Sequence, residues 1–333
     1  MGPTELGSSV ARTLRDVVRK HRGNPEWEEP RATYSIWHVV RIHLRCVLEG
    51  VCPGVLYERL ETRDGYRRAN GLPNRLMSLS QVKKRMKTAM FLRALFEVLK
   101  VSAIRTLRGL GPEEVRVVPM DLTKLESDPD RDPQGAWGFT SGGFFWGYKL
   151  GLITSENGVI LGVTLMKGNW TEFNVSRRLL KMARDVIHTS FGILPVEYVL
   201  CDSGFDGEST YQAAHCTLKA PVLCPPRRKR NPKAKTAKTI LRNTRWLSPH
   251  RFRDQQLWQE DWAKEIFRKR SGIERVNSQL KDTAIRIDEI PIRQRGVMKL
   301  LRLCLAKLVI YNSALNVNLQ KGLPLRRIKV LAG

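Results

Sequence analysis

The sequence predicts two regions, an all-α region over residues 1–110 and an α/β domain over residues 111–333. Before the segment Gly109-Leu110-Gly111-Pro112, apolar residues recur at three- and four-residue steps, which is the period of amphipathic helices. From Val115 onward, short β-prone runs alternate with helical patterns, which is typical of a sheet flanked by helices. A chain of 333 residues is long enough for two such domains.

The first region combines helical patterns with basic residues. Residues 51–110 hold 13 Lys and Arg against 4 Asp and Glu. After Ser78, a capped helix presents Gln81, Lys84 and Arg85 on its exposed side, as a recognition helix in a helix-turn-helix does. A solvated helix that only covers the core of a bundle has the same pattern, so the sequence leaves both interpretations open. The predicted helices cover residues 9–21, 35–48, 56–62, 79–87 and 90–107.

Two aspartates of the second region each follow a short β-prone run. Residues 115–120 lead to Asp121, and residues 196–201 lead to Asp202. In open α/β sheets, ligands bind at the carboxyl edge of the strands. Two aspartates at that edge, on adjacent parallel strands, could therefore share one divalent cation.

The remaining pattern brings the number of predicted strands to five. The dipeptide Asn157-Gly158 is a strong hairpin signal and predicts two strands, over residues 144–154 and 159–166, directly after the Asp121 strand. Helices over residues 172–191 and 207–218 flank the Asp202 strand, and a short strand surrounds Val222.

A helix near the C-terminal end carries a lone carboxylate between cations. Phe267, Arg270, Glu274 and Lys281 fall within about 60° of one helix face. An adjacent apolar arc lets the helix bury one stripe and point Glu274 into a cleft. The alternative is a surface helix on which Arg270 and Glu274 form an i,i+4 ion pair. The apolar arc consists of Trp262, Ile266, Ile273, Val276 and Leu280.

The charge of the chain indicates a polyanionic partner. With 58 Lys and Arg against 32 Asp and Glu, the net charge is +26, which favours nucleic acid as the partner over a membrane surface. We therefore expect a cytoplasmic, nucleoid-associated protein. Residues 227–253 hold 11 Lys and Arg and no acidic residue, so we expect either a loop that follows a DNA backbone or a solvated tether. Trp246 within this run could stack on a base or anchor the loop. The run starts with Arg227, Arg228, Lys229 and Arg230.

Four motifs, which occur along the chain in the same order as in the family, resemble the DDE transposases of prokaryotic insertion sequences. The family signature Tyr-x2-Arg-x3-Glu-x6-Lys is matched by the Phe267, Arg270, Glu274 and Lys281 set, with Phe in place of Tyr. Residues 201–206 resemble the segment around the second catalytic aspartate. Residues 167–172 resemble the turn that leads into the helix before that aspartate. The first motif, Asp121-Leu122-Thr123-Lys124, departs most, because it lacks the small Ser or Thr that often follows the first aspartate. The resemblance covers residues 115–316.

The resemblance implies a fold, in which the five strands form a mixed sheet with the two aspartate strands adjacent and parallel, and a set of roles. Residues 1–110 would be a helical DNA-binding region, and residues 111–333 an RNase H-like catalytic domain with a short basic insertion at about residues 225–255. Asp121, Asp202 and Glu274 would hold two Mg²⁺ ions, with Mn²⁺ as a substitute. Phe267, Arg270 and Lys281 would contact DNA.

The same resemblance implies nicking at element ends followed by strand transfer into target double-stranded DNA, by a dimer assembled on DNA. Two other functions stay open from the sequence. One is a stand-alone two-metal nuclease, which would cut but not join. The other is a catalytically silent, transposase-derived DNA-binding protein. Three intact acidic positions argue against the silent protein, because carboxylates that face phosphates cost affinity for DNA.

Overall fold

The computed structural model describes residues 3–27, 34–70, 72–73, 75–140, 142–226, 249–282, 285–289, 296–326 and 328. The chain divides into two compact units, each described by itself below. Unit 1 comprises Met1–Gly109, Asp282–Ile287 and Met298–Gly333, and unit 2 comprises Leu110–Lys281 and Asp288–Val297. The last helix of the chain therefore belongs to the same unit as the first ones, while a functional division at residue 110 stays a prediction.

Unit 1 is helical. All five predicted helices are present, and α4 and α13 are additions that the sequence analysis did not predict. The Ser35 side chain accepts a hydrogen bond from the Trp37 N–H at the start of α2, and Gly50 ends this helix in the left-handed conformation at φ 64°. The helices are α1 Pro3–Lys20, α2 Ile36–Glu49, α3 Pro53–Thr62, α4 Asp64–Ala69, α5 Leu79–Arg85, α6 Ala89–Leu110 and α13 Val297–Gln320.

Helix α13 is long and apolar enough to cross a membrane by length and composition alone, but most of it is buried inside the fold. Polar contacts hold it among the helices of unit 1. Ser9 Oγ donates to the Ser313 carbonyl at 3.3 Å, and Asn312 Nδ2 donates to Ser102 Oγ at 3.3 Å. A mostly buried helix with such contacts is typical of a protein core, so α13 is part of the core of unit 1.

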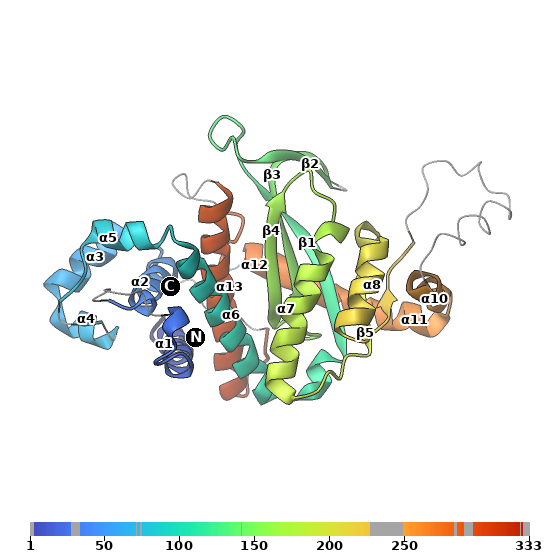
Figure 1. The fold of residues 1–333 in the computed structure, drawn as a ribbon, viewed down its shortest axis with the longest axis horizontal. Coiled ribbons are helices and arrows are strands. Elements are labelled where there is room, and N and C mark those ends of the chain that lie inside the picture. The colour runs from blue at the N-terminus through green and yellow to red at the C-terminus, as the bar shows by residue number, and fades with distance from the viewer. Residues whose placement is uncertain are drawn as a thin grey trace. The chain divides into compact units, whose positions relative to one another are not determined.

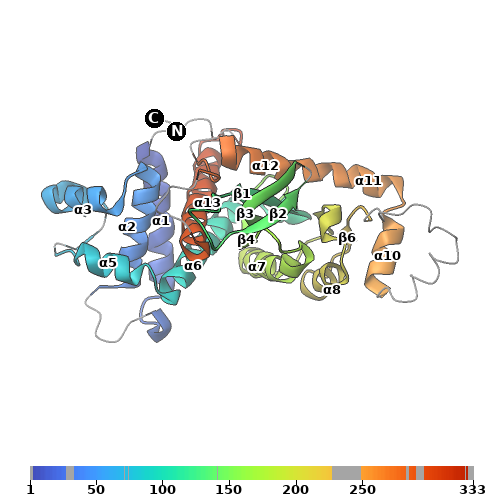
Figure 2. The ribbon, with the colours of Figure 1, turned by 90° about the horizontal axis from the view of Figure 1, so that it is seen from above.

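Unit 2 contains a six-stranded mixed sheet in the order β2-β3-β1-β5-β6, with β4 also paired to β3. Strand β1 is antiparallel to β3 and parallel to β5, as the resemblance implies for the two aspartate strands. Figures 1 and 2 show α7 and α8 on one face of the sheet and α11 and α12 on the other. The strands are β1 Val117–Glu126, β2 Ala136–Thr140, β3 Gly143–Thr154, β4 Ile160–Lys167, β5 Tyr198–Cys201 and β6 Val222–Leu223. The helices are α7 Phe173–Phe191, α8 Glu208–Thr217, α10 Pro249–Leu257, α11 Asp261–Phe267 and α12 Ser271–Asp282.

The prediction of five strands was wrong, because a further strand, β2, follows β1 in the chain and pairs with β3 at the edge of the sheet. This strand has a glycine, Gly138, at its centre, which weakens its strand signal in the sequence. It forms through pairing with β3, where Trp137 lies opposite Trp146 and Phe139 opposite Phe144, with both ring pairs in edge contact.

The prediction of one continuous helix from Phe267 to Lys281 was also wrong. Helix α11 ends at Phe267, a 3₁₀ turn covers Arg268–Arg270, and α12 begins at Ser271. The break coincides with Ser271-Gly272, a pair of residues that weakens the α-helical hydrogen-bond ladder. Arg270 therefore lies in a tight turn just before the helix that carries Glu274.

Candidate active site

Two of the three predicted carboxylates meet because of the register of β1 and β5. The parallel pairing ends with Met120 opposite Cys201, so the next residue on each strand, Asp121 and Asp202, lies beside the other. Asp202 follows the end of β5 as predicted. Asp121 was predicted at the end of its strand but lies inside β1, which continues to Glu126 because it pairs with β3.

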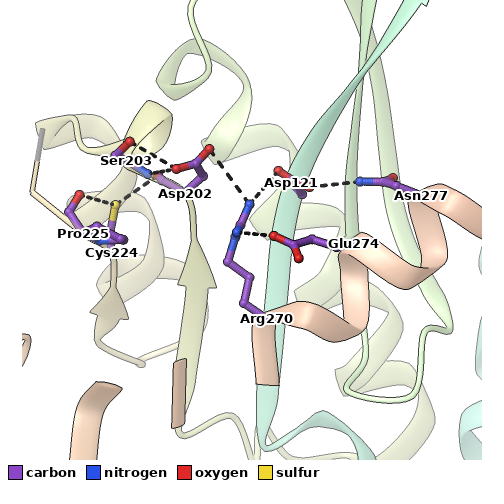
Figure 3. A network of polar contacts seen from close by, with 8 residues as sticks. All are labelled: Asp121, Asp202, Ser203, Cys224, Pro225, Arg270, Glu274 and Asn277. Atoms are coloured by element: carbon purple, nitrogen blue, oxygen red, sulfur yellow. Dashed lines mark hydrogen bonds and ion pairs between the residues drawn. The ribbon is translucent and has the colours of Figure 1, made fainter. Parts of the chain in front are cut away.

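The third carboxylate comes from α12, and the Arg270 guanidinium contacts all three. Arg270 Nη2 lies 3.2 Å from Asp121 Oδ1 and 3.9 Å from Asp202 Oδ2, while Nη1 donates to Glu274 Oε1 at 2.7 Å (Figure 3). The i,i+4 ion pair with Glu274 is thus present. It is one edge of a larger arrangement in which three carboxylates surround one positive charge.

The position of Glu274 follows from the buried stripe of α12. Ile273, Val276 and Leu280 are fully buried, as the sequence predicts, and they fix the helix against the domain. The predicted stripe does not extend over all of α11, because Trp262 remains 39% exposed and Ile266 is only partly buried.

Asp202 is fixed by contacts close to it in sequence and on the next strand. Its Oδ1 accepts hydrogen bonds from the backbone N–H and the hydroxyl of Ser203. Its carbonyl accepts a hydrogen bond from Cys224 Sγ at 3.1 Å, from the residue that follows β6. The carboxylate of Asp202 stays exposed, so it remains accessible to a ligand.

Burial dominates the protonation of Asp121. Desolvation, with a contribution from the negative charge of Asp202, raises the pKa of Asp121 to about 6, although Arg270 acts in the opposite direction. For Arg270, burial acts to lower the pKa, but the carboxylates of Asp121, Asp202 and Glu274 together raise it above its usual value. The site therefore favours a cation at the position of the guanidinium.

The donor set suits a hard divalent cation, because it consists of carboxylate oxygens from three separate elements. In the described part of the chain, no three His, Cys, Asp or Glu side chains are arranged closely enough to hold a metal ion. The guanidinium of Arg270 lies between the carboxylates and supplies the positive charge there. The chemistry of the three carboxylates therefore suits a divalent cation, while in this structure the guanidinium takes the place of the positive charge.

Two members of the predicted signature set lie outside this cluster. Phe267 packs on a core formed by Val117, Leu200, Leu223 and Ala263, and its ring lies 5.8 Å from the guanidinium carbon of Arg270. This ring contact supports Arg270 from the domain side. Lys281, at the end of α12, forms no hydrogen bond or ion pair with another described residue, and its contact with DNA stays a prediction.

The sequence reasoning missed Asn277. Its Nδ2 donates to Asp121 Oδ2 at 2.9 Å. The signal that could have found it is its spacing, because Asn277 follows Glu274 by three residues and so lies on the same side of the helix.

The other predicted DNA-contact residues differ in how far the structure describes them. On α5, Gln81 completes a capping box with Ser78, Arg85 donates to the Tyr34 carbonyl, and Lys84 is exposed. The basic run was predicted to be a loop, but its last residues, from Pro249 onward, belong to helix α10. Arg227, Arg228, Lys229, Arg230 and Trp246 lie outside the described residues.

A comparison with protein families identifies the domain. The family model described as the transposase DDE domain matches residues 115–312, more than half of the chain. The mixed sheet with helices on both faces is consistent with an RNase H-like DDE domain. DDE transposases bind DNA and use divalent metal ions. No curated protein matches the chain. Because this match covers more than half of the chain, we conclude that the chain belongs to the DDE transposase family.

Proposed function

We propose that this protein is the transposase of a prokaryotic insertion sequence, which binds the ends of its element, nicks them and transfers the freed strand to target DNA. The observation that carries the proposal is the contact of Asp121, Asp202 and Glu274 with one guanidinium. Three carboxylates from distant parts of the chain are held around one cation position, in a chain of net charge +26. This arrangement supports metal-dependent phosphoryl transfer on a polyanion.

In this proposal the three carboxylates hold two Mg²⁺ ions, and Mn²⁺ can replace them. Asp121, Asp202 and Glu274 would together supply the carboxylate oxygens that hold these ions. When bound, the ions stabilise the attacking and leaving oxygens of the phosphodiester. Water is the nucleophile for nicking and the freed 3′-hydroxyl is the nucleophile for joining, so neither step needs a side-chain nucleophile.

Arg270 has two partners in this proposal, the carboxylates in the free protein and a DNA phosphate in the complex. A guanidinium matches both, because carboxylate and phosphate each accept two parallel N–H donors. Arg270 Nη2 is shared between Asp121 and Asp202, at 3.2 and 3.9 Å, so its departure frees both carboxylates at once. Its side chain stays beside the site to bind the phosphate that enters.

DNA binding is assigned to several basic elements. The exposed Lys84 on α5, with Gln81 and Arg85, is proposed to recognise the element ends, and the basic run from Arg227 to follow the DNA backbone. The protein is proposed to act in the cytoplasm, at the nucleoid, as a dimer assembled on double-stranded DNA.

Cleavage and joining of DNA that carries the flanks of the gene tests the proposal. Asp121→Ala, Asp202→Ala and Glu274→Ala should each abolish both steps, with DNA binding intact or tighter because negative charge is removed from the DNA-facing site. Asp261→Ala is the matched control, since the Asp261 side chain is 99% exposed and is outside the carboxylate cluster. Nicking without joining would identify a stand-alone nuclease. Binding without any cleavage in Mg²⁺ or Mn²⁺ would identify a silent DNA-binding protein.

A further inference from the structure

Each oxygen of the Asp121 carboxylate has its own side-chain donor. Arg270 Nη2 donates to Oδ1 at 3.2 Å, and Asn277 Nδ2 donates to Oδ2 at 2.9 Å (Figure 3). The two donors differ in charge. A divalent cation that approached Oδ1 would repel the guanidinium, whereas a neutral amide on Oδ2 is compatible with a cation.

The two donors also differ in how firmly their backbone is held. Asn277 lies in the middle of α12, next to the fully buried Val276 and three residues before the fully buried Leu280. Arg270 reaches the site with a long side chain from the 3₁₀ turn before that helix. Loss of the Arg270 contact would therefore leave the bond from Asn277 to Asp121 in place.

The amide of Asn277 is not fully satisfied by the protein. Its Oδ1 is buried and accepts no hydrogen bond from the described residues. A buried polar atom without a partner is unfavourable for folding, so this side chain is poorly suited to stabilising α12. The bond to Asp121 is the contact that accounts for an amide at this position.

We infer that Asn277 is a positioning residue, which holds Asp121 Oδ2 so that Oδ1 is presented to a divalent cation once Arg270 has moved aside. This inference rests on the proposed metal-binding role of the three carboxylates. Carboxylates that ligate metals are commonly held by such hydrogen bonds, and loss of the partner costs about 10–100-fold in metal affinity.

Mn²⁺ binding to the full-length protein, followed by electron paramagnetic resonance without DNA, tests this role independently of cleavage. The parent for this test carries Arg270→Gln, so that the guanidinium does not compete with Mn²⁺ for the carboxylates. Asn277→Leu, and the smaller Asn277→Ser in case the leucine does not fit, should weaken Mn²⁺ binding about 10–100-fold. Both should melt within a few degrees of the parent, because the unpaired Oδ1 is removed together with the bond to Asp121. Ser278→Ala, an exposed position on the same helix, should bind Mn²⁺ like the parent.

Each outcome decides a different point. Parent-like Mn²⁺ affinity in both Asn277 variants overturns the positioning role. A large fall in melting temperature in both variants, together with weaker binding, shows that Asn277 acts on the fold and also overturns it. If Asp121→Ala binds Mn²⁺ as well as the parent does, the metal assignment of the proposed function fails, whatever the Asn277 variants show.

Discussion

At the scale of single residues, Arg270 connects the parts of the active site. It contacts Asp121, which is 149 residues away in the sequence, as well as Asp202 and the neighbouring Glu274. Its ring contact with Phe267 and its contacts with the carboxylates hold one flat guanidinium in a defined place. The planar fork matters here, because the ammonium group of lysine cannot make the same set of contacts.

Arg270→Lys should therefore slow cleavage strongly, whereas Lys281→Arg should have a mild effect. A point charge cannot hold a phosphate through two parallel hydrogen bonds, and the exchange of Lys281 keeps its charge. Single-turnover nicking with bound DNA is the measurement. Nicking at the parent rate by Arg270→Lys, together with a melting temperature several degrees lower, would show that Arg270 is only a structural ion-pair partner.

The pKa of Asp121 gives a prediction about stability. Its pKa of about 6 in the folded chain lies above the ordinary value of 3.8, so the folded state binds its proton more tightly than the unfolded chain does. The contribution of this group to stability is therefore present at low pH and is lost as the pH rises from about 4 through about 6. The side chain of Asp121→Asn is neutral at every pH. The melting temperature of this variant should therefore exceed that of the parent by more at pH 7.5 than at pH 5.

Thermal unfolding at the two pH values measures this difference. Asp261→Asn is the control, because the exposed Asp261 has its pKa lowered by its hydrogen bond to Lys264 and should show no such gain. An equal gain for Asp121→Asn at both pH values would mean that the burial of this carboxylate does not affect folding.

At the scale of elements, α12 brings function and packing together. Its buried stripe is separate from the side that carries Glu274 and Asn277. The position of two active-site side chains therefore depends on how tightly the apolar stripe is packed.

Leu280→Ala should lower the free energy of unfolding by about 2–5 kcal/mol, because it removes a fully buried side chain and leaves a cavity. It should also slow cleavage under conditions where the protein is still folded, since α12 would lose its fixed position. Urea unfolding and single-turnover cleavage at low temperature measure the two effects. If Leu280→Ala is destabilised but cleaves at the parent rate, the tight packing of α12 is not needed to position the active-site side chains.

On helix α5, the variants of Gln81 and Lys84 are expected to differ in their effect on stability. Gln81 accepts a hydrogen bond from the Ser78 N–H at 3.0 Å, so Gln81→Ala should cost about 0.5–1.5 kcal/mol of stability for this bond, in addition to weaker binding to element ends. Lys84 is exposed, so Lys84→Ala should leave the melting temperature unchanged and weaken binding to element ends. Competition between end-bearing and unrelated DNA is the measurement. Equal weakening on both DNAs would indicate a phosphate contact in place of end recognition.

At the scale of the whole molecule, the net charge of +26 governs how the chain meets DNA. Replacement of Arg227, Arg228, Lys229 and Arg230 by Gln should weaken binding to all sequences alike and flatten its salt dependence, because phosphate contacts carry no base information. Binding measured over a range of salt concentrations checks this. An unchanged salt slope would indicate that the basic run is a solvated tether.

Much of this protein follows from the sequence alone, because the relevant signals are local. Periodicity predicts helices α1, α2, α3, α5 and α6 of unit 1, and it predicts the buried stripe of α12. The dipeptide Asn157-Gly158 predicts the hairpin. The β-prone run before Asp202 predicts β5 and the place of that aspartate at its end. These features depend on residues that are close together in the chain, so a short window of sequence contains the information.

Other features were decided only by contacts between distant segments. Strand β2 and the extension of β1 past Asp121 both require pairing with β3. The contact of Arg270 with three carboxylates, and the bond from Asn277 to Asp121 across 156 residues, require the register of β1 on β5 and the packing of α12. No local pattern encodes a distance between segments so far apart. The sequence therefore determined which chemical groups are available, and the tertiary structure decided which of them meet.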